Sequence, residues 1–479
     1  MHEFFCGPTS FALHRIPPQA KQVLPAFPYI ETSLDRRRLS LHEPESYWPS
    51  LPLHILSADK AGKTRAMGIR EHVLTAELPP GSFQTDDTLG LTFASPQLTL
   101  LTLAPLVSIY QLAMAAYELC GAFAIFDPGP ELQEQIDIAN AQRLVWPGGW
   151  RQVHSKDGVA ASLWIRDPLL TIPELERYCA QTKGVRGNVK LVKALRMVNG
   201  VCASPLEVQA SMLLGLPPRL GGEGLGPFDN NHAIALTPAA RTLAGQNTCY
   251  ADLYFEGTSD RAPIVVECQG RVVHDSPEQG GVDANRTLAL QEMGMDVILL
   301  TKEQLAEQVR FDTLVGHLRR KLGVRKRAKS KTALREATAL REHLFGDWET
   351  YYLPQRDLEH RNRLRTKRHK AQKKAKAVRK TVSRSKSCCK GPKAVRETAN
   401  INGHVSQQAR AVMDKDLHGL ASQCARIAMR SHRNVLAARL ARSAISLERI
   451  SPNYHGPGPQ RVHTATNSHG HELKPSKQR

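Results

Sequence analysis

Residues Ile264–His274, "IVVECQGRVVH", contain an apolar run that ends in a charge. The three β-branched residues at its start are typical of a buried strand. They lead directly into Glu267, and Gln269 follows two residues later. Because side chains alternate along a strand, Glu267 and Gln269 are expected on the same face. A carboxylate at the end of a core strand is either a surface residue or a ligand, and the neighbouring sequence bears on this choice.

A second strand is predicted over Ala251–Phe255, separated from the first by a turn around Gly257–Asp260. An antiparallel hairpin of these two strands would bring Asp252 beside Glu267, although they are fifteen residues apart in sequence. Two carboxylates that converge repel each other, and a divalent cation offsets this repulsion. Hard oxygen ligands favour Mg²⁺ or Mn²⁺. Gln269 could orient a water molecule there, but an amide cannot deprotonate it.

Helix and strand signals alternate on both sides of this hairpin, and together they predict a mixed α/β domain over residues 201–322. The predicted elements are a helix capped by Ser204 with Pro205 at its first position, a short strand at Ala233–Leu236, a helix closed by Gly294, the buried strand "MDVILL", and a helix that starts at Thr301 and reaches Leu322. Glu207 lies in the first turn of the first helix. It completes a capping box with Ser204, which needs no metal, and a role in the site stays open beside this one.

Asp252, the run Glu267-Cys268-Gln269, His274 and "DANR" (Asp283–Arg286), followed by "LALQEMGMDVILLT", resemble the PD-(D/E)XK nuclease superfamily. The flanking residues are similar to its Vsr-like branch, which includes very-short-patch repair endonucleases. The resemblance covers roughly residues 204–310. It implies a restriction-endonuclease-like mixed sheet flanked by helices, a Mg²⁺ or Mn²⁺ cofactor and a DNA substrate.

The resemblance also implies a role for each matching residue. Asp252 and Glu267 would ligate the metal, Gln269 would occupy the position usually held by lysine, Glu207 would be the helix carboxylate that completes the site, and His274, Asp283 and Arg286 would border it or face the phosphate. The sequence differs from the pattern at Gln269 and at Ala251, which stands where proline is the hallmark. Simpler alternatives stay open, namely a surface pair of His274 with Asp275 and a weak helical ion pair of Asp283 with Arg286.

Residues 1–150 are predicted to form an α/β N-terminal domain, with a helix capped by Ser95, and residues 151–200 a helical connector. The segment "SPQLTLLTLA…LCG" is loosely similar to abortive-infection antitoxin-type regulators. The apolar run Leu98–Phe126 is long enough to suggest a membrane span. Because Pro105 divides it and polar residues interrupt it, a buried strand and helix is the favoured interpretation.

The composition changes after about residue 325, where the chain becomes polar and basic. Fifteen Lys or Arg and no acidic residue lie between Arg361 and Lys393, and the whole chain carries a net charge of +20. Residues 323–400 are predicted to be a basic nucleic-acid-binding arm, with a solvated tail as the alternative. Residues 401–479 are predicted to be an Ala/Arg-rich helix followed by a disordered tail. The expected phosphate-binding residues are Arg361, Arg363, Arg365, Lys367, Arg368, Lys370, Lys373, Lys374, Lys376, Arg379 and Lys380.

These features predict a cytoplasmic, Mg²⁺-dependent endonuclease that acts on DNA, or on RNA, without a membrane partner. The nine irregularly spaced cysteines fit a reducing compartment, and the N-terminus lacks the pattern of a signal peptide. The alternative is a non-catalytic DNA-binding regulator of toxin–antitoxin or phage-defence type that retains a nuclease fold.

Overall fold

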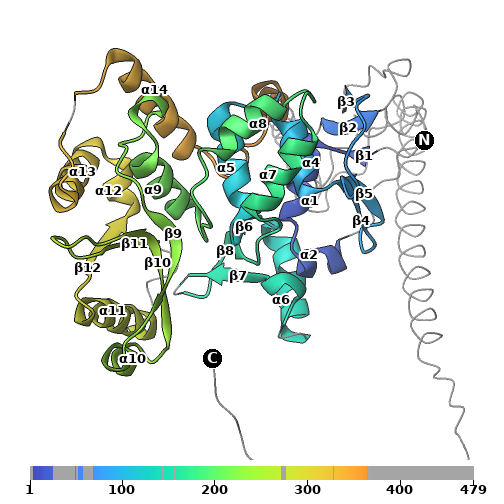
Figure 1. Cartoon of the computed structure of the whole chain (residues 1–479). Coiled ribbons are helices and arrows are strands. Elements are labelled where there is room, and N and C mark those ends of the chain that lie inside the picture. Colours follow the sequence, from blue (N-terminus) through green and yellow to red (C-terminus); the bar gives the residue numbers. More distant parts are fainter. Residues whose placement is uncertain are drawn as a thin grey trace, which may run out of the picture. The chain divides into compact units, whose positions relative to one another are not determined.

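The computed structural model describes residues 4–24, 49, 52–57, 68–142, 145–155, 157–270, 277–326, 328–363 and 366 (Figure 1). The chain divides into two compact units, Met1–Arg379 and Lys380–Arg479. The described residues all belong to the first unit, and the structural statements below concern them. The predicted helix and tail over residues 401–479 lie outside the described residues.

A five-stranded mixed sheet with the order β3-β2-β1-β5-β4 forms the N-terminal part. Its strands are β1 (Phe4–Phe5), β2 (Leu53–Ser57), β3 (Ile69–Val73), β4 (Phe83–Asp86) and β5 (Leu91–Ala94). Two helices, α1 (Gly7–Arg15) and α2 (Pro18–Val23), follow the first strand. α1 is almost entirely buried and packs against β2 and α4. The predicted α/β character of this region is therefore confirmed.

The apolar run Leu98–Phe126 is divided into α4 (Pro96–Leu103), α5 (Ile109–Cys120) and β6 (Phe123–Ile125). As predicted, Ser95 caps the first helix through its hydroxyl and Pro96 stands at the first position. Ser108 starts the second helix with a reciprocal capping box to Gln111. The run is buried in the protein core, and none of the described helices is both long and apolar enough to span a membrane.

The segment predicted to be a helical connector begins instead with two strands. After α6 (Gly129–Gln142) and a short 3₁₀ turn at Pro147–Gly149, β7 (Arg151–His154) and β8 (Ala160–Ile165) pair with β6 in the order β6-β8-β7. Trp164 fills the space behind this sheet and is fully buried. The predicted helices follow as α7 (Ile172–Gln181), which starts with the Thr171–Glu174 capping box, and α8 (Asn188–Leu195). The helical prediction was wrong for residues 151–165, because β8 pairs with the distant residues 123–125, β7 pairs with β8, and neither strand has much signal of its own.

Residues 205–322 form a four-stranded mixed sheet flanked by helices, as predicted. The elements are α9 (Pro205–Gly215), a 3₁₀ turn (Pro218–Leu220), β9 (Asp229–Ala235), α10 (Pro238–Ala244), β10 (Thr248–Phe255), β11 (Ile264–Gln269), α11 (Pro277–Glu292), β12 (Asp296–Thr301), α12 (Lys302–Ala306) and α13 (Gln308–Leu322). The strand order is β12-β11-β10-β9; β9, β10 and β11 are antiparallel neighbours, and β12 runs parallel to β11. The sequence predicted a single helix from Thr301 to Leu322, whereas the structure has two helices there, α12 and α13.

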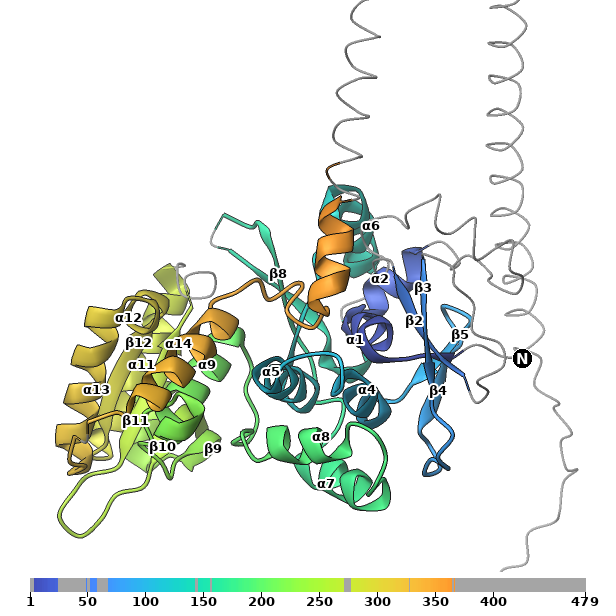
Figure 2. The same cartoon turned by 90° about the horizontal axis from the view of Figure 1, so that it is seen from above.

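Helices cover both faces of this sheet (Figure 1). On one face Leu253 and Val266 pack in a core shared with α9 and α13, and on the other Val265 packs with Ala289 and Leu290 of α11. Figure 2 shows α9 and α14 (Lys331–Leu344) side by side, and Gln209 of α9 donates a hydrogen bond to the Leu344 carbonyl at 2.8 Å. Because helices cover both faces of the sheet, a ligand-binding site on it is expected at the ends of its strands.

Part of the predicted basic arm is built into this fold, so the prediction for residues 323–400 was wrong over residues 331–353. Leu340 and Leu344 of α14 are fully buried, and the segment after it buries Tyr351. Arg15 and Glu118 form a buried bidentate pair at 2.7 and 2.6 Å, and the Tyr351 hydroxyl donates to Glu118 at 3.0 Å. This network connects α1, α5 and the C-terminal segment in one core.

Residues 355–363 are helical and lead into the basic run. Asp357 is buried there, with a carboxylate oxygen 3.0 Å from His54 Nε2 of β2. Of the expected phosphate-binding residues, Arg361 is partly exposed and Arg363 is exposed. The other nine, Arg365 and the eight from Lys367 to Lys380, lie outside the described residues.

Candidate functional site

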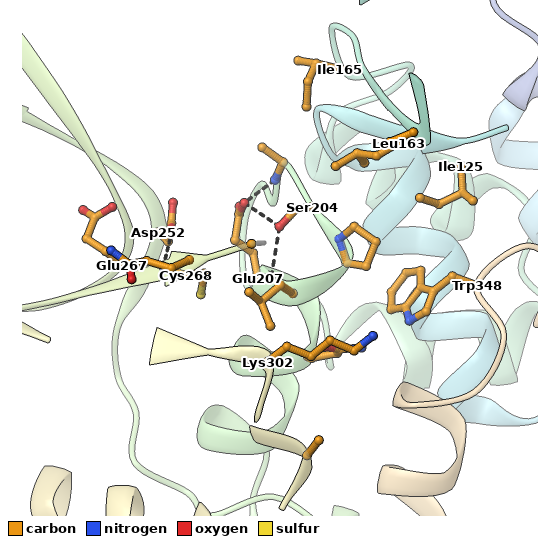
Figure 3. Close-up of a pocket in the computed structure, with 18 of the residues that line it drawn as sticks. Ile125, Leu163, Ile165, Ser204, Glu207, Asp252, Glu267, Cys268, Lys302 and Trp348 are labelled. Atoms are coloured by element: carbon orange, nitrogen blue, oxygen red, sulfur yellow. Dashed lines mark hydrogen bonds between the residues drawn. The ribbon is translucent and has the colours of Figure 1, made fainter. Parts of the chain in front are cut away.

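Carboxylates from three elements line one cavity of about 940 Å³: Glu207 of α9, Asp252 of β10 and Glu267 of β11 (Figure 3). The hairpin brings the last two together. Leu253 pairs with Val266 across the antiparallel strands, so the next position along each strand is Asp252 and Glu267. The predicted juxtaposition therefore follows from the observed register.

Glu207 serves both as a helix-capping residue and as a member of this cluster. The Ala203 N–H donates to its Oε2 at 2.6 Å, the Ser204 hydroxyl donates to its Oε1 at 2.8 Å, and its own N–H donates to Ser204 Oγ at 3.3 Å. Burial, and then the nearby negative charges of Asp252 and Glu267, raise the pKa of Glu207 to about 8. The two neighbouring carboxylates thus add to the effect of burial on Glu207.

Asp252 is tied to the neighbouring strand through the backbone. The Cys268 N–H donates to Asp252 Oδ2 at 2.7 Å, and the Asp252 side chain projects into the cavity in Figure 3. Burial, together with the adjacent acids, raises the pKa of the Cys268 thiol well above its usual range. Cys268 is thus a protonated packing residue, while Asp252 has a fixed orientation.

Glu267 forms an ion pair with Arg286 of α11 at 2.9 Å, and the two side chains are 14% and 28% exposed. Arg286 also donates to the Tyr250 carbonyl. Arg286 therefore contacts the carboxylate cluster, as the position bordering the site would require. Asp283 lies on the same helix, although its side chain lies outside the described residues, as does the whole of His274.

Gln269 lines the cavity beside Lys302, which the sequence analysis missed. Gln269 pairs with Thr301 of the parallel strand β12, so the residue after Thr301 emerges at the same sheet edge. In Figure 3 the Lys302 side chain extends toward Trp348, away from Asp252 and Glu267. A charge placed directly after an apolar parallel strand was the signal in the sequence that could have identified Lys302.

The opposite wall of the cavity comes from the β6-β8-β7 sheet and from residues 346–349. Ile125 of β6, Leu163 and Ile165 of β8, and Trp348 contribute apolar surface (Figure 3). The Trp348 indole N–H donates to the Leu344 carbonyl at 2.9 Å, which fixes the ring. No sequence signal identified this wall, because its residues are distant in sequence from the carboxylates.

The donor chemistry fits a hard divalent cation held by two carboxylates. Among the side chains that line the cavity, six are acidic and two are basic: Glu207, Asp252, Glu267, Glu303, Asp347 and Glu349 against Arg286 and Lys302. Within the part of the chain that the structure describes, no three or more His, Cys, Asp or Glu side chains are grouped so that they could hold a metal ion. Mg²⁺ does not require such a group, because it keeps several waters and binds through one or two carboxylates and substrate phosphates.

A scan against protein-family models, a search of curated proteins and a search of solved structures find no match to this chain. Support for a function therefore comes from the sequence motif and from the geometry of the carboxylate cluster.

Proposed function

We propose that this chain is a Mg²⁺- or Mn²⁺-dependent endonuclease of the PD-(D/E)XK superfamily, similar to its Vsr-like branch, that hydrolyses phosphodiester bonds in DNA. The observation that supports it best is the position of Asp252 and Glu267, each one residue beyond the paired residues Leu253 and Val266 of adjacent antiparallel strands, with Glu207 lining the same cavity.

The fold of residues 205–322 is consistent with the proposal. The resemblance implies a restriction-endonuclease-like mixed sheet flanked by helices, and β9 to β12 form a mixed sheet with helices on both faces. Glu267 and Gln269 lie at the carboxyl end of β11, beside the end of the parallel strand β12. This is the edge at which α/β sheets generally bind ligands.

Asp252 and Glu267 would hold the ion, and Glu207 would complete the acidic set. A bound Mg²⁺ would polarise the phosphate and lower the pKa of a water molecule. Hydrolysis consumes that water: a P–O bond to it forms, the P–O bond to the leaving sugar oxygen breaks, and that oxygen takes up a proton. Gln269 would orient the water through its amide, and Arg286 would face the developing negative charge.

The basic run after Arg361 supports a polyanionic partner. Fifteen Lys or Arg residues without an acidic one would contact phosphates without reading sequence. Binding through such a run weakens steeply as the salt concentration rises. The acidic cavity would then carry out the hydrolysis, and the basic run would supply the affinity for nucleic acid.

The test is nicking of supercoiled plasmid in Mg²⁺ or Mn²⁺ by the wild type, Glu267→Gln and Glu134→Gln. Glu134 is an exposed acid on α6, distant in sequence from the cluster and not part of the cavity wall, and serves as the matched control. We expect nicking by the wild type and the control and its loss in Glu267→Gln. Equal nicking by all three proteins would exclude this site.

A non-catalytic DNA-binding regulator is the second candidate, and the Arg286–Glu267 pair favours it. An arginine at 2.9 Å already neutralises one of the two expected metal ligands, and Gln269 stands where lysine is usual. This candidate predicts salt-sensitive DNA binding that is unchanged by EDTA, together with no nicking by the wild type in either metal.

A further inference from the structure

The cavity has two chemically different ends. Glu207, Asp252 and Glu267 line one end (Figure 3). Ile125, Leu163 and Trp348 give the other end its apolar surface, with Asp347 and Glu349 on either side of Trp348 in the sequence and the Lys302 side chain extending toward it. The arrangement fits a ligand that carries a cation-bound anion at one end and a flat apolar group at the other.

The apolar end is built to accept a planar ring. Trp348 is partly exposed, and its ring is held by the bond from its indole N–H to Leu344 and by edge contact with Tyr351, with ring centroids 5.4 Å apart. Leu163 and Ile165 belong to β8 and are themselves only partly buried. Aromatic side chains of this kind bind nucleobases by stacking, with little dependence on sequence.

We propose that the cavity takes one unpaired nucleotide, with its phosphate at the carboxylates and its base against Trp348 and the β6–β8 face. This inference rests on the proposed function, and it names the substrate as single-stranded or locally unpaired nucleic acid. A volume of about 940 Å³ is in the range that encloses one small ligand. A base inside a duplex is stacked on both sides, so it must leave the stack to enter such a pocket.

The test uses the full chain and thymidine 5′-monophosphate, which contains no phosphodiester bond to cleave. Its affinity is measured calorimetrically in Mg²⁺ at high salt, which screens the basic run. Trp348→Ala should weaken binding about 5- to 100-fold, and Trp348→Phe should retain most of it because a ring remains. A single-stranded oligothymidine should displace the mononucleotide, and a blunt hairpin duplex should not. Nicking of single-stranded and duplex oligonucleotides is measured in parallel.

The outcomes separate the inference from the proposed function. Trp348-dependent binding of the mononucleotide without cleavage of any substrate would support the pocket and refute the nuclease. Cleavage of duplex at least as fast as of single strands, unchanged in Trp348→Ala, would support the nuclease and overturn the pocket. Neither binding nor cleavage would overturn both.

Discussion

Replacing Glu207 by glutamine should stabilise the metal-free protein at pH 8 and change its stability little at pH 5. Glu207 is 8% exposed, and burial together with Asp252 and Glu267 raises its pKa from 4.5 to about 8. In the unfolded chain this carboxyl loses its proton near pH 4.5, whereas in the folded chain it keeps the proton up to about pH 8. The unfolded state therefore binds fewer protons in this window, and the folded state loses stability as the pH rises through it.

The size of the effect follows from the shift. Each pKa unit corresponds to about 1.4 kcal/mol, so the wild type should lose on the order of 3 kcal/mol of unfolding free energy between pH 5 and pH 8 through this group. The substitution should remove that loss. A glutamine amide also fits the local hydrogen bonds: its oxygen can accept from the Ala203 N–H, and its NH₂ can donate to Ser204 Oγ, which now donates to the carboxylate.

The assay is urea denaturation in EDTA at several pH values between 5 and 8. Glu174→Gln is the matched control, because Glu174 occupies the same third position of a capped helix, α7, but is exposed. Hydrogen bonds from Thr171 lower the pKa of Glu174, so it is ionised across the whole range and its substitution should leave the pH profile unchanged. Mg²⁺ should stabilise the wild type more at pH 8 than at pH 5. Parallel pH profiles for the wild type and Glu207→Gln would refute the raised pKa of Glu207.

Three further predictions test other parts of the argument. Arg286→Gln should tighten Mg²⁺ binding by up to about fivefold in calorimetry, because a partly exposed ion pair contributes about 1 kcal/mol or less; unchanged affinity would show that Arg286 does not compete with the ion. Glu118→Ala should cost about 3–5 kcal/mol of unfolding free energy in urea, because it leaves the buried Arg15 guanidinium uncompensated; a loss below about 1 kcal/mol would contradict this. Gln269→Lys should raise the rate of plasmid nicking about tenfold or more, equivalent to about 1.4 kcal/mol of transition-state stabilisation. A variant that nicks more slowly than the wild type would show that catalysis by this chain does not follow the lysine-dependent pattern.

Local rules explain why much of the central sheet could be predicted from the sequence. Ser95, Ser204 and Thr301 all cap the helices they were expected to start, because a cap acts on backbone groups within four residues. The hairpin that joins Asp252 to Glu267 is equally local, since a short turn sets the strand register.

Contacts between distant segments explain what the sequence could not show. The strand β8 depends on pairing with β6, and β7 in turn pairs with β8. Trp348 reaches the cavity through a segment whose average composition is basic. The apolar spacing of Leu340 and Leu344, four residues apart on α14, was hidden by the surrounding lysines and arginines. The average amino-acid composition of residues 323–400 is that of a solvated arm. The burial of Tyr351, however, depends on Arg15 and Glu118, which lie more than two hundred residues away in the sequence.

The Arg286–Glu267 pair reconciles the acidic cavity with a polyanionic substrate. Without a cation, Arg286 neutralises Glu267 and stabilises the edge of the sheet. If a divalent ion took that carboxylate, Arg286 would keep its bond to the Tyr250 carbonyl but lose its acidic partner, and a phosphate bound in the cavity that Arg286 lines could replace that partner. Cation binding and phosphate binding would then favour each other, because one event supplies the charge that the other needs. Arg286→Gln should therefore tighten Mg²⁺ binding and weaken Mg²⁺-dependent mononucleotide binding in the same protein, a pair of opposite effects that a purely structural ion pair would not produce.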